Sequence, residues 1–255
     1  MSGSPSADTA DALPLLDLRQ VKRAWGDGPD GFVLDVERFV LRLGEKLAIV
    51  GRSGSGKSTF LDLLALTLSP SSSARFFLAA GDDGAEIDGL WRASELSRLA
   101  RLRARHVGYV LQTGGLLPFL SARENILLPL RLLGWQDTSP ANRLMDRLEV
   151  TEFARRRPAD LSIGQRQRVA IARALVHSPE LVLADEPTAS LDKANADTVM
   201  EIFAELVRDQ GCSTILVTHN DAQAKAFGFL PVDCQPQESD GHGSRSVIDF
   251  SGGAA

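Results

Sequence analysis

The stretch that decides the fold is Gly51-Arg52-Ser53-Gly54-Ser55-Gly56-Lys57-Ser58-Thr59, which fits the pattern G-x-x-x-x-G-K-[ST]. An apolar run at residues 47–50 leads into this stretch, and a helical pattern of apolar residues leads out of it. The glycines let successive backbone N–H groups curl around phosphate oxygens, and the start of the following helix adds the positive end of its dipole. We therefore expect the Lys57 ammonium to reach the β- and γ-phosphate oxygens of a nucleotide, and the Ser58 hydroxyl to complete a Mg²⁺ shell. The competing interpretation, a glycine-rich turn that binds nothing, is disfavoured because both the strand and the helix are in place.

A second signal lies downstream, where the apolar run Leu181-Val182-Leu183-Ala184 ends in Asp185-Glu186. The carboxyl end of a parallel strand lies at the edge of the sheet where ligands bind. We expect Asp185 to hold Mg²⁺, directly or through water, and Glu186 to polarise the attacking water as a general base. An apolar run that ends in two carboxylates is often only a strand end. Behind a phosphate-binding loop, the same pattern indicates nucleotide hydrolysis.

The apolar runs of the chain do not alternate with polar residues, and helical patterns separate them. Such runs occur at 107–111, 181–184 and 214–218, and they indicate a parallel sheet covered on both faces. Short β-like runs fill residues 16–50, and residues 113–160 are mainly helical in pattern. The sequence therefore predicts the α/β class.

Composition limits the functions that the chain can have. The chain has 255 residues and a formal net charge of −5, and this acidic balance argues against a nucleic-acid-binding protein. Its two cysteines give no disulfide framework and fit a reducing compartment. Its apolar stretches fall short of the ~20 residues that a membrane-spanning helix needs. We therefore expect a cytoplasmic protein, and any role at a membrane must come through a partner.

The run Leu161-Ser162-Ile163-Gly164-Gln165-Arg166-Gln167-Arg168 resembles the signature motif of ATP-binding cassette (ABC) ATPases. Other motifs of that family follow in the family's order, from about residue 16 to residue 221: Trp25 at the adenine-stacking position, Gln112 as the Q-loop, Ser190-Leu191-Asp192 as the D-loop and His219 as the switch histidine. The spacing of Ser162 and Gln165 is also a capping-box pattern that opens a helix. In isolation, Ser162 would only cap that helix, and Trp25 would only pack beside a turn.

The resemblance implies an α/β P-loop NTPase with a RecA-like parallel sheet core, an N-terminal antiparallel β subdomain and an inserted α-helical subdomain. It covers an ATPase domain at 14–230, with its helical subdomain at about 113–162. The polar composition of residues 1–13 predicts a disordered leader, and residues 231–255, which depart from the family, are expected to form an irregular C-terminal tail. The resemblance also implies a Mg²⁺-dependent ATPase that closes as a homodimer when ATP is bound.

The resemblance assigns roles to the matching residues. Ser162, Gly164 and Gln165 would bind the γ-phosphate held by the other subunit, and Asp192 would cross the dimer interface. Gln112 would touch Mg²⁺ or the water, and His219 would hydrogen-bond the γ-phosphate.

The chain departs from the family pattern at several places. Ile163 stands where the family usually has glycine, and Asn220 replaces the usual aspartate after the switch histidine. The turn at residues 69–90 lacks the family's spacing of proline and glycine. The end of the chain differs most, and we expect it to form an irregular hairpin or a partner-binding tail. Because the active-site residues are all present, we expect an active enzyme.

The segment 115–130 resembles the ATPases of the lipoprotein-release, macrolide-efflux and cell-division type. That likeness implies separate integral-membrane permease subunits as partners and, through the permease, periplasmic components, with no nucleic acid. One alternative is a mechanotransmitting or regulatory ATPase that acts on a membrane partner without transport. Another is a soluble ABC protein of repair or translation, which tandem cassettes or long coiled-coil inserts would mark, and this chain has neither.

Overall fold

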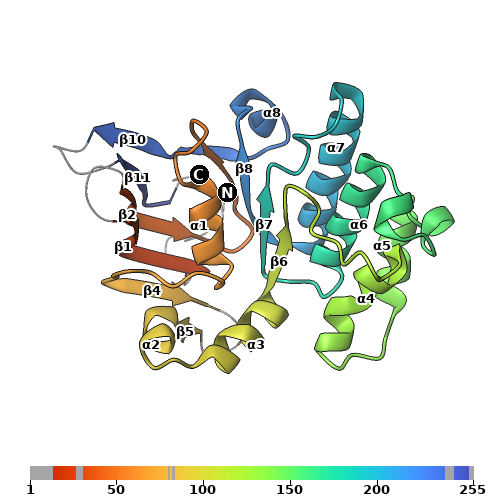
Figure 1. Ribbon diagram of the computed structural model, residues 1–255, viewed down its shortest axis with the longest axis horizontal. Helices are drawn as coiled ribbons and strands as arrows, with labels where there is room; N and C mark the ends of the chain where they lie inside the picture. Colours follow the sequence, from red (N-terminus) through yellow and green to blue (C-terminus); the bar gives the residue numbers. More distant parts are fainter. Residues whose placement is uncertain (1–13, 27–30, 80, 82–83, 239–243, 253–255) are drawn as a thin grey trace, which may run out of the picture.

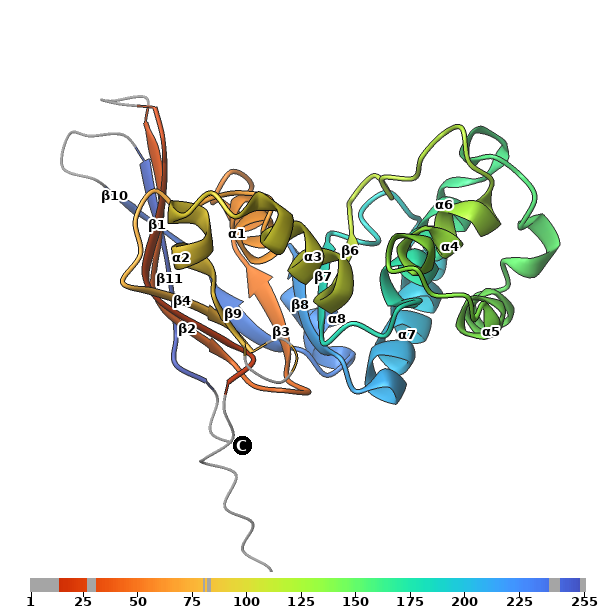
Figure 2. The same ribbon diagram turned by 90° about the horizontal axis from the view of Figure 1, so that it is seen from below.

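The computed structural model describes residues 14–26, 31–79, 81, 84–238 and 244–252. The predicted leader at 1–13 lies outside the described residues. The described chain folds as two sheets with helices between them and on the far side of one of them (Figures 1 and 2).

The core sheet is five-stranded, and neighbouring strands in it pair in parallel throughout the described residues. Its strands are, in spatial order, β6 (Val107–Val110), β7 (Leu181–Asp185), β8 (Ser213–Thr218), β3 (Lys46–Val50) and β9 (Leu230–Asp233). The apolar runs that the sequence predicts as buried strands are largely buried on both faces of this sheet, except that Leu111 follows β6 and is exposed. All carboxyl ends lie at one edge, where the glycine-rich loop follows β3.

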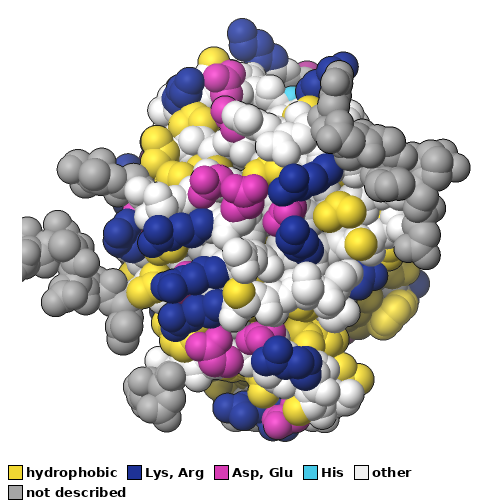
Figure 3. Space-filling view, turned by 90° about the vertical axis from the view of Figure 1, so that its left-hand side faces the viewer, with side chains coloured by type: hydrophobic (Ala, Val, Ile, Leu, Met, Phe, Trp, Pro, Cys, Tyr) yellow, Lys and Arg dark blue, Asp and Glu magenta, His cyan; other side chains and the backbone are white. Residues whose placement is uncertain are grey.

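The second sheet is six-stranded and mainly antiparallel; only the pairing of β11 with β2 is parallel. Its order is β10 (Gln235–Glu238), β11 (Ser244–Phe250), β2 (Phe32–Leu41), β1 (Leu16–Trp25), β4 (Arg75–Leu78) and β5 (Ala85–Glu86). Its outer face carries interspersed basic and acidic side chains (Figure 3). Two carboxylates of this sheet are almost fully buried, and each meets two cations: Asp17 meets Arg19 and Arg75, and Asp35 meets Lys22 and Arg245.

The helices are placed by the alternation of side chains along the core strands. Leu181, Leu183 and their counterparts on β3 and β8 face one side, where α1 (Lys57–Leu64) fills the space between the two sheets. There Phe60 of α1 packs edge-on against Phe39 of β2, with ring centroids 5.0 Å apart. Val182 and Ala184 face the opposite side, where three helices complete a second core. These are α4 (Ala122–Leu132), α6 (Ile163–Leu175) and α7 (Lys193–Gln210).

The remaining helices connect these layers. They are α2 (Ile87–Arg92), α3 (Leu96–His106), α5 (Ser139–Arg147) and α8 (Asp221–Ala226). Short 3₁₀ turns at Thr151–Phe153 and Pro158–Asp160 join α5 to α6. None of the helices in the described ranges is long and apolar enough to cross a bilayer.

We expected an irregular hairpin or a partner-binding tail at 231–255, but the described part of that segment forms strands with regular pairings, and β10 pairs with β11 antiparallel, as in a hairpin. β9 pairs with β3 in the core sheet, and β11 pairs with β2 in the other sheet, so the end of the chain ties both sheets together. Arg245 of β11 stabilises the pairing of β11 with β2 through an ion pair of 2.7 Å to the buried carboxylate of Asp35 on β2. The boundary placed between 230 and 231 falls inside β9.

Candidate active site

The glycine-rich loop joins the carboxyl end of β3 to the start of α1. Gly56 has a φ of 87°, in the left-handed region that favours glycine, and a Cβ there would lie 2.6 Å from Cζ of Phe32. Lys57 is the first residue of α1, and its Nζ donates to the carbonyl oxygens of Gly51 (2.9 Å) and Arg52 (2.8 Å). The loop thus closes on the lysine ammonium, and its positive charge lies within the curve of the loop.

This loop forms one wall of a hollow of about 370 Å³, here called the P-loop hollow. The hollow is lined by Phe32, Ser53, Gly54, Gly56, Lys57, Ser58, Thr59, Gln112, Asp185, Glu186 and His219. The structure therefore brings together residues that are far apart in the sequence: the first and the last of them, Phe32 and His219, are 187 positions apart. Of the loop residues 51–59, Gly51, Arg52 and Ser55 do not line the hollow, and Ser55 is buried.

Glu186 lies at the centre of the polar side chains in the P-loop hollow. Its carboxylate forms an ion pair with Nε2 of His219 and accepts a long hydrogen bond of 3.5 Å from Nε2 of Gln112. Its backbone has a φ of 43°, uncommon for a residue with a side chain, and its N–H donates to the carbonyl of Val217 on β8 (3.0 Å). The neighbouring strands thus fix an unfavourable backbone conformation that keeps this carboxylate between the other two groups.

The donor set beside the loop fits a magnesium ion. Ser58 supplies a hydroxyl, Asp185 a carboxylate and Gln112 an amide oxygen, and all three side chains line the same hollow. Oxygen ligands of this kind are those that Mg²⁺ prefers, usually together with phosphate oxygens and water. Because Gln112 uses its amide nitrogen toward Glu186, its amide oxygen is available for a cation.

A second set of predicted residues lies at the start of α6. Ser162 caps the helix: its Oγ accepts from the N–H of Gln165 (3.2 Å), and its own N–H donates to Oε1 of Gln165 (3.0 Å). The predicted capping box is therefore present. Gly164 lies in the first turn, and Ile163 is about half exposed beside it. The free N–H groups of this turn give the helix end a positive character.

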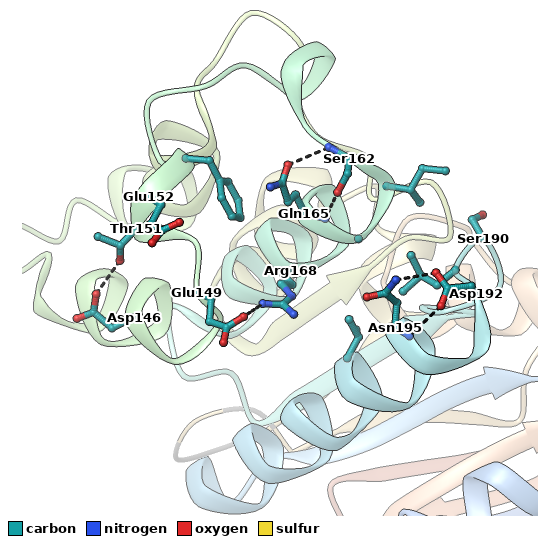
Figure 4. A pocket seen from close by; sticks show the side chains of 15 residues that line it. Asp146, Glu149, Thr151, Glu152, Ser162, Gln165, Arg168, Ser190, Asp192 and Asn195 are labelled. Atoms are coloured by element: carbon teal, nitrogen blue, oxygen red, sulfur yellow. Dashed lines mark hydrogen bonds and ion pairs between the residues drawn. The ribbon is translucent and has the colours of Figure 1, made fainter.

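Asp192 caps the next long helix, α7, in the same way. Its carboxylate accepts from the N–H of Asn195 (3.2 Å) and from the Asn195 amide (2.6 Å), and these bonds lower the pKa of Asp192. Both helix starts face a second hollow of about 930 Å³, here called the signature hollow (Figure 4). The signature hollow shares no lining residue with the P-loop hollow.

The comparison with protein families agrees with this geometry. A family profile described as "ABC transporter" matches residues 34–189, more than half of the chain. This chain belongs to the ABC transporter family. The predicted resemblance and fold class are thereby confirmed.

Individual relatives narrow the comparison. The lipoprotein-releasing system ATP-binding protein LolD of Novosphingobium aromaticivorans is 40% identical over 217 residues, which cover 83% of this chain and 92% of that protein. The macrolide export ATP-binding/permease protein MacB 2 of Aeromonas hydrophila is 41% identical over 214 residues, covering 81% of this chain and 31% of that longer protein. Among solved structures, the dimeric ATP-binding cassette MJ0796 in a post-hydrolysis state with ADP and Pi has a TM-score of 0.71 at 30% identity, covering 86% of this chain and 93% of that one.

These comparisons make the chain an ATP-binding, ATP-hydrolysing subunit of an ABC transporter. They do not favour the alternative of a regulatory ATPase without transport.

Trp25, the predicted adenine-stacking residue, lies outside both hollows. It ends β1 and is 45% exposed, and the Arg23 guanidinium lies 4.2 Å from its ring centroid. Its partner across the β1–β2 pairing is Phe32, which lines the P-loop hollow. The ring is therefore next to the hollow, at its β-sheet side.

Two residues beside the loop were not predicted from the sequence. Phe32 lines the hollow and leaves no room for a side chain at Gly56. An aromatic residue facing Trp25 in a predicted hairpin could have indicated it. Cys234 lies under the loop, where its Sγ donates to the carbonyl of Ser55 (3.0 Å). Its sequence surroundings carry no periodic signal that could have placed it there.

Proposed function

We propose that two copies of this chain close on ATP, with the P-loop hollow of each copy facing the signature hollow of the other. One observation carries the proposal: the two predicted halves of the site line separate hollows on the same chain. A nucleotide held by Lys57 would then meet a second copy's Ser162 and Gly164, and Asp192 would lie across the same interface. Each closed dimer would hold two ATP molecules, so hydrolysis would reopen it.

Within the P-loop hollow, the loop N–H groups and Lys57 would bind the phosphates. Ser58, Asp185 and Gln112 would hold Mg²⁺, which when bound supplies positive charge to the β- and γ-phosphate oxygens. Glu186 would take a proton from the attacking water, and its ion pair with His219 supports this role because it aims the carboxylate into the hollow. His219 would place the γ-phosphate, and Trp25 would stack on the adenine.

The partner that we propose is a separate integral-membrane permease. The segment after Gln112 exposes three large apolar side chains, Phe119, Leu132 and Trp135, which support a docking surface for such a partner. The chain would then lie at the inner face of the cell membrane through that contact. Because LolD and MacB are named for lipoprotein release and macrolide export, we propose that this cassette drives the outward movement of an amphiphilic cargo, with periplasmic components joined through the permease.

The dimer and the base are tested together with Glu186→Gln. The amide keeps the size of the side chain but cannot accept the proton, so we expect ATP hydrolysis to fall by about a hundredfold or more while ATP binding remains. With Mg-ATP the variant should elute as a dimer in size-exclusion chromatography. Glu205→Gln, on the exposed surface of α7, is the matched control and should hydrolyse ATP at the parent rate. Unchanged turnover by Glu186→Gln would refute the base assignment, and a monomer with bound ATP would refute the paired hollows.

The membrane partner is tested by purifying tagged Glu186→Gln from native membranes with Mg-ATP and identifying the proteins that accompany it. Recovery of a multi-spanning membrane protein would support the permease. Recovery of soluble proteins alone would contradict the membrane role and leave the ATPase assignment intact.

A further inference from the structure

The end of β9 lies directly beneath the glycine-rich loop. The N–H of Cys234 donates to the carbonyl of Val50 (2.8 Å), the residue before the loop. The carbonyl oxygen of Cys234 lies so close to Gly51 that a Cβ there would be 2.7 Å from it. The thiol then reaches into the loop and donates to the carbonyl of Ser55 at 3.0 Å. One residue of the last part of the chain thus touches the loop at its entry and at its middle.

The contact with the Ser55 carbonyl constrains the orientation of a phosphate-binding group. The Ser55 C=O and the Gly56 N–H belong to the same peptide unit, which is planar and trans, so the two groups point in opposite directions. Because the carbonyl points down to the Cys234 sulfur, the Gly56 N–H points away from it. Gly56 lines the P-loop hollow, whereas Ser55 is buried and does not line it.

The thiol is suited to hold this carbonyl. Cys234 is 1% exposed and Ser55 is 4% exposed, so water has little access to replace a lost donor. Burial raises the pKa of the Cys234 thiol, which keeps the sulfur protonated and able to donate at neutral pH. A valine at this position would fill similar space and leave the Ser55 carbonyl without that donor.

We propose that Cys234 is a positioning residue for ATP binding, which acts by holding the Ser55–Gly56 peptide with its N–H turned toward the nucleotide phosphates. This inference rests on the proposed role of the loop in phosphate binding. It adds to that role a contribution from Cys234, which lies 179 positions after Ser55 in the chain.

The matched control is the other buried cysteine. Cys212 precedes β8 at the opposite end of the core sheet, and its sulfur contacts Gln210 at 3.7 Å. Cys212→Val removes a buried thiol without touching the loop. Comparing it with Cys234→Val separates the loss of the contact with Ser55 from the general cost of changing a buried cysteine.

The experiment measures the Kd of a fluorescent ATP analogue, the KM and kcat for ATP, and the Tm of the two valine variants and of Cys234→Ser. We expect Cys234→Val to raise Kd and KM by about two- to fivefold with kcat nearly unchanged, because a weak hydrogen bond that supports binding is lost. Cys234→Ser, which keeps a donor, should bind the analogue more tightly than Cys234→Val. Cys212→Val should bind ATP like the parent.

Each other outcome counts against the positioning role. Equal Kd values for Cys234→Val and Cys212→Val would overturn it, and so would a serine variant that binds no better than the valine variant. If Cys234→Val does not fold, Cys234→Ala supplies the donor-free comparison with Cys234→Ser. Failure of the parent protein itself to bind the analogue would instead contradict the proposed function.

Discussion

The P-loop hollow is built from the carboxyl ends of core strands, whereas the signature hollow is built from the first turns of two helices. Most of the lining of the P-loop hollow comes from the loop after β3, the first turn of α1 and the ends of β6, β7 and β8, which the parallel sheet brings to one edge, and Phe32 of β2 adds to it from the other sheet. In the signature hollow, Ser162 and Asp192 each bond to a residue three positions further along their own helix. The P-loop hollow therefore depends on long-range packing, whereas the signature hollow depends on local helix capping.

We expect this difference to separate nucleotide binding from hydrolysis. The P-loop hollow holds the lysine, the predicted metal ligands and the predicted base, so one copy can bind a nucleotide. The signature hollow offers helix N-termini and no lysine, and its described lining includes the acidic residues Asp146, Glu149 and Glu152. We therefore expect changes in the first half to abolish binding, and changes in the second to spare binding and to impair closure.

The largest effect is expected from Lys57→Ala. The substitution removes the ammonium that the loop encloses, and we expect the Kd for ATP to rise by about a hundredfold or more. Isothermal titration calorimetry with ATP measures this change, and Lys225→Ala, an exposed lysine on α8, is the control. Tight ATP binding by Lys57→Ala would break the comparison, because the P-loop hollow would then not be the binding half.

The same contrast explains what the sequence could predict. The loop, Asp185-Glu186 and the capping box at Ser162 are each readable from a few neighbouring residues, and the structure has them on the predicted elements. The final strands were missed because their partners lie far away: Leu230 pairs with Leu47, and Arg245 pairs with Val33. Local patterns do not record such pairings.

Prolines are a second reason why the sequence did not predict these strands. Pro231 lies in β9 and Pro236 lies in β10, and proline in a run normally argues against a strand. Both strands lie at the edges of their sheets, where a missing N–H is tolerated. An edge position is a property of the whole sheet, so the sequence of the strand alone could not reveal it.

A smaller effect is expected at Ser162, where helix capping and phosphate binding can be separated. Ser162→Asp keeps a good N-cap residue, so we expect stability close to that of the parent. Its negative charge would repel the γ-phosphate of the facing site, and ATP hydrolysis should fall about tenfold or more while ATP binding to one copy is kept. ATPase assays, urea unfolding and calorimetry measure the three quantities.

The chain contains a matched control for this experiment. Ser121 forms the same capping box with Glu124 at the start of α4. Ser121→Ala and Ser162→Ala should each lose about 1 kcal/mol of stability, since each loses an N-cap. Only Ser162→Ala should also lose hydrolysis. Equal ATPase rates in these two variants would leave Ser162 with capping alone.

The smallest effect on ATP binding and hydrolysis is expected at the end of α6 that lies away from the signature hollow. His177 follows this helix, is 3% exposed and hydrogen-bonds through Nε2 to the carbonyl of Val107 on β6 (3.3 Å). Burial lowers the pKa of His177 to about 4, below the value of 6.5 for an exposed histidine. As the pH falls from 6.5 toward 4, the unfolded chain therefore takes up a proton that the folded chain does not, and stability is lost over that window.

We expect the free energy of unfolding to fall by about 1 to 2 kcal/mol between pH 7.5 and pH 5 because of His177. His177→Gln cannot take up this proton, and urea unfolding at the two pH values should show a smaller loss for it than for the parent. At pH 7.5 the variant should bind ATP with the parent Kd, because the P-loop hollow does not include α6. A raised Kd at pH 7.5 would mean that the contact of His177 with β6 affects the P-loop hollow. The two hollows would then not be independent.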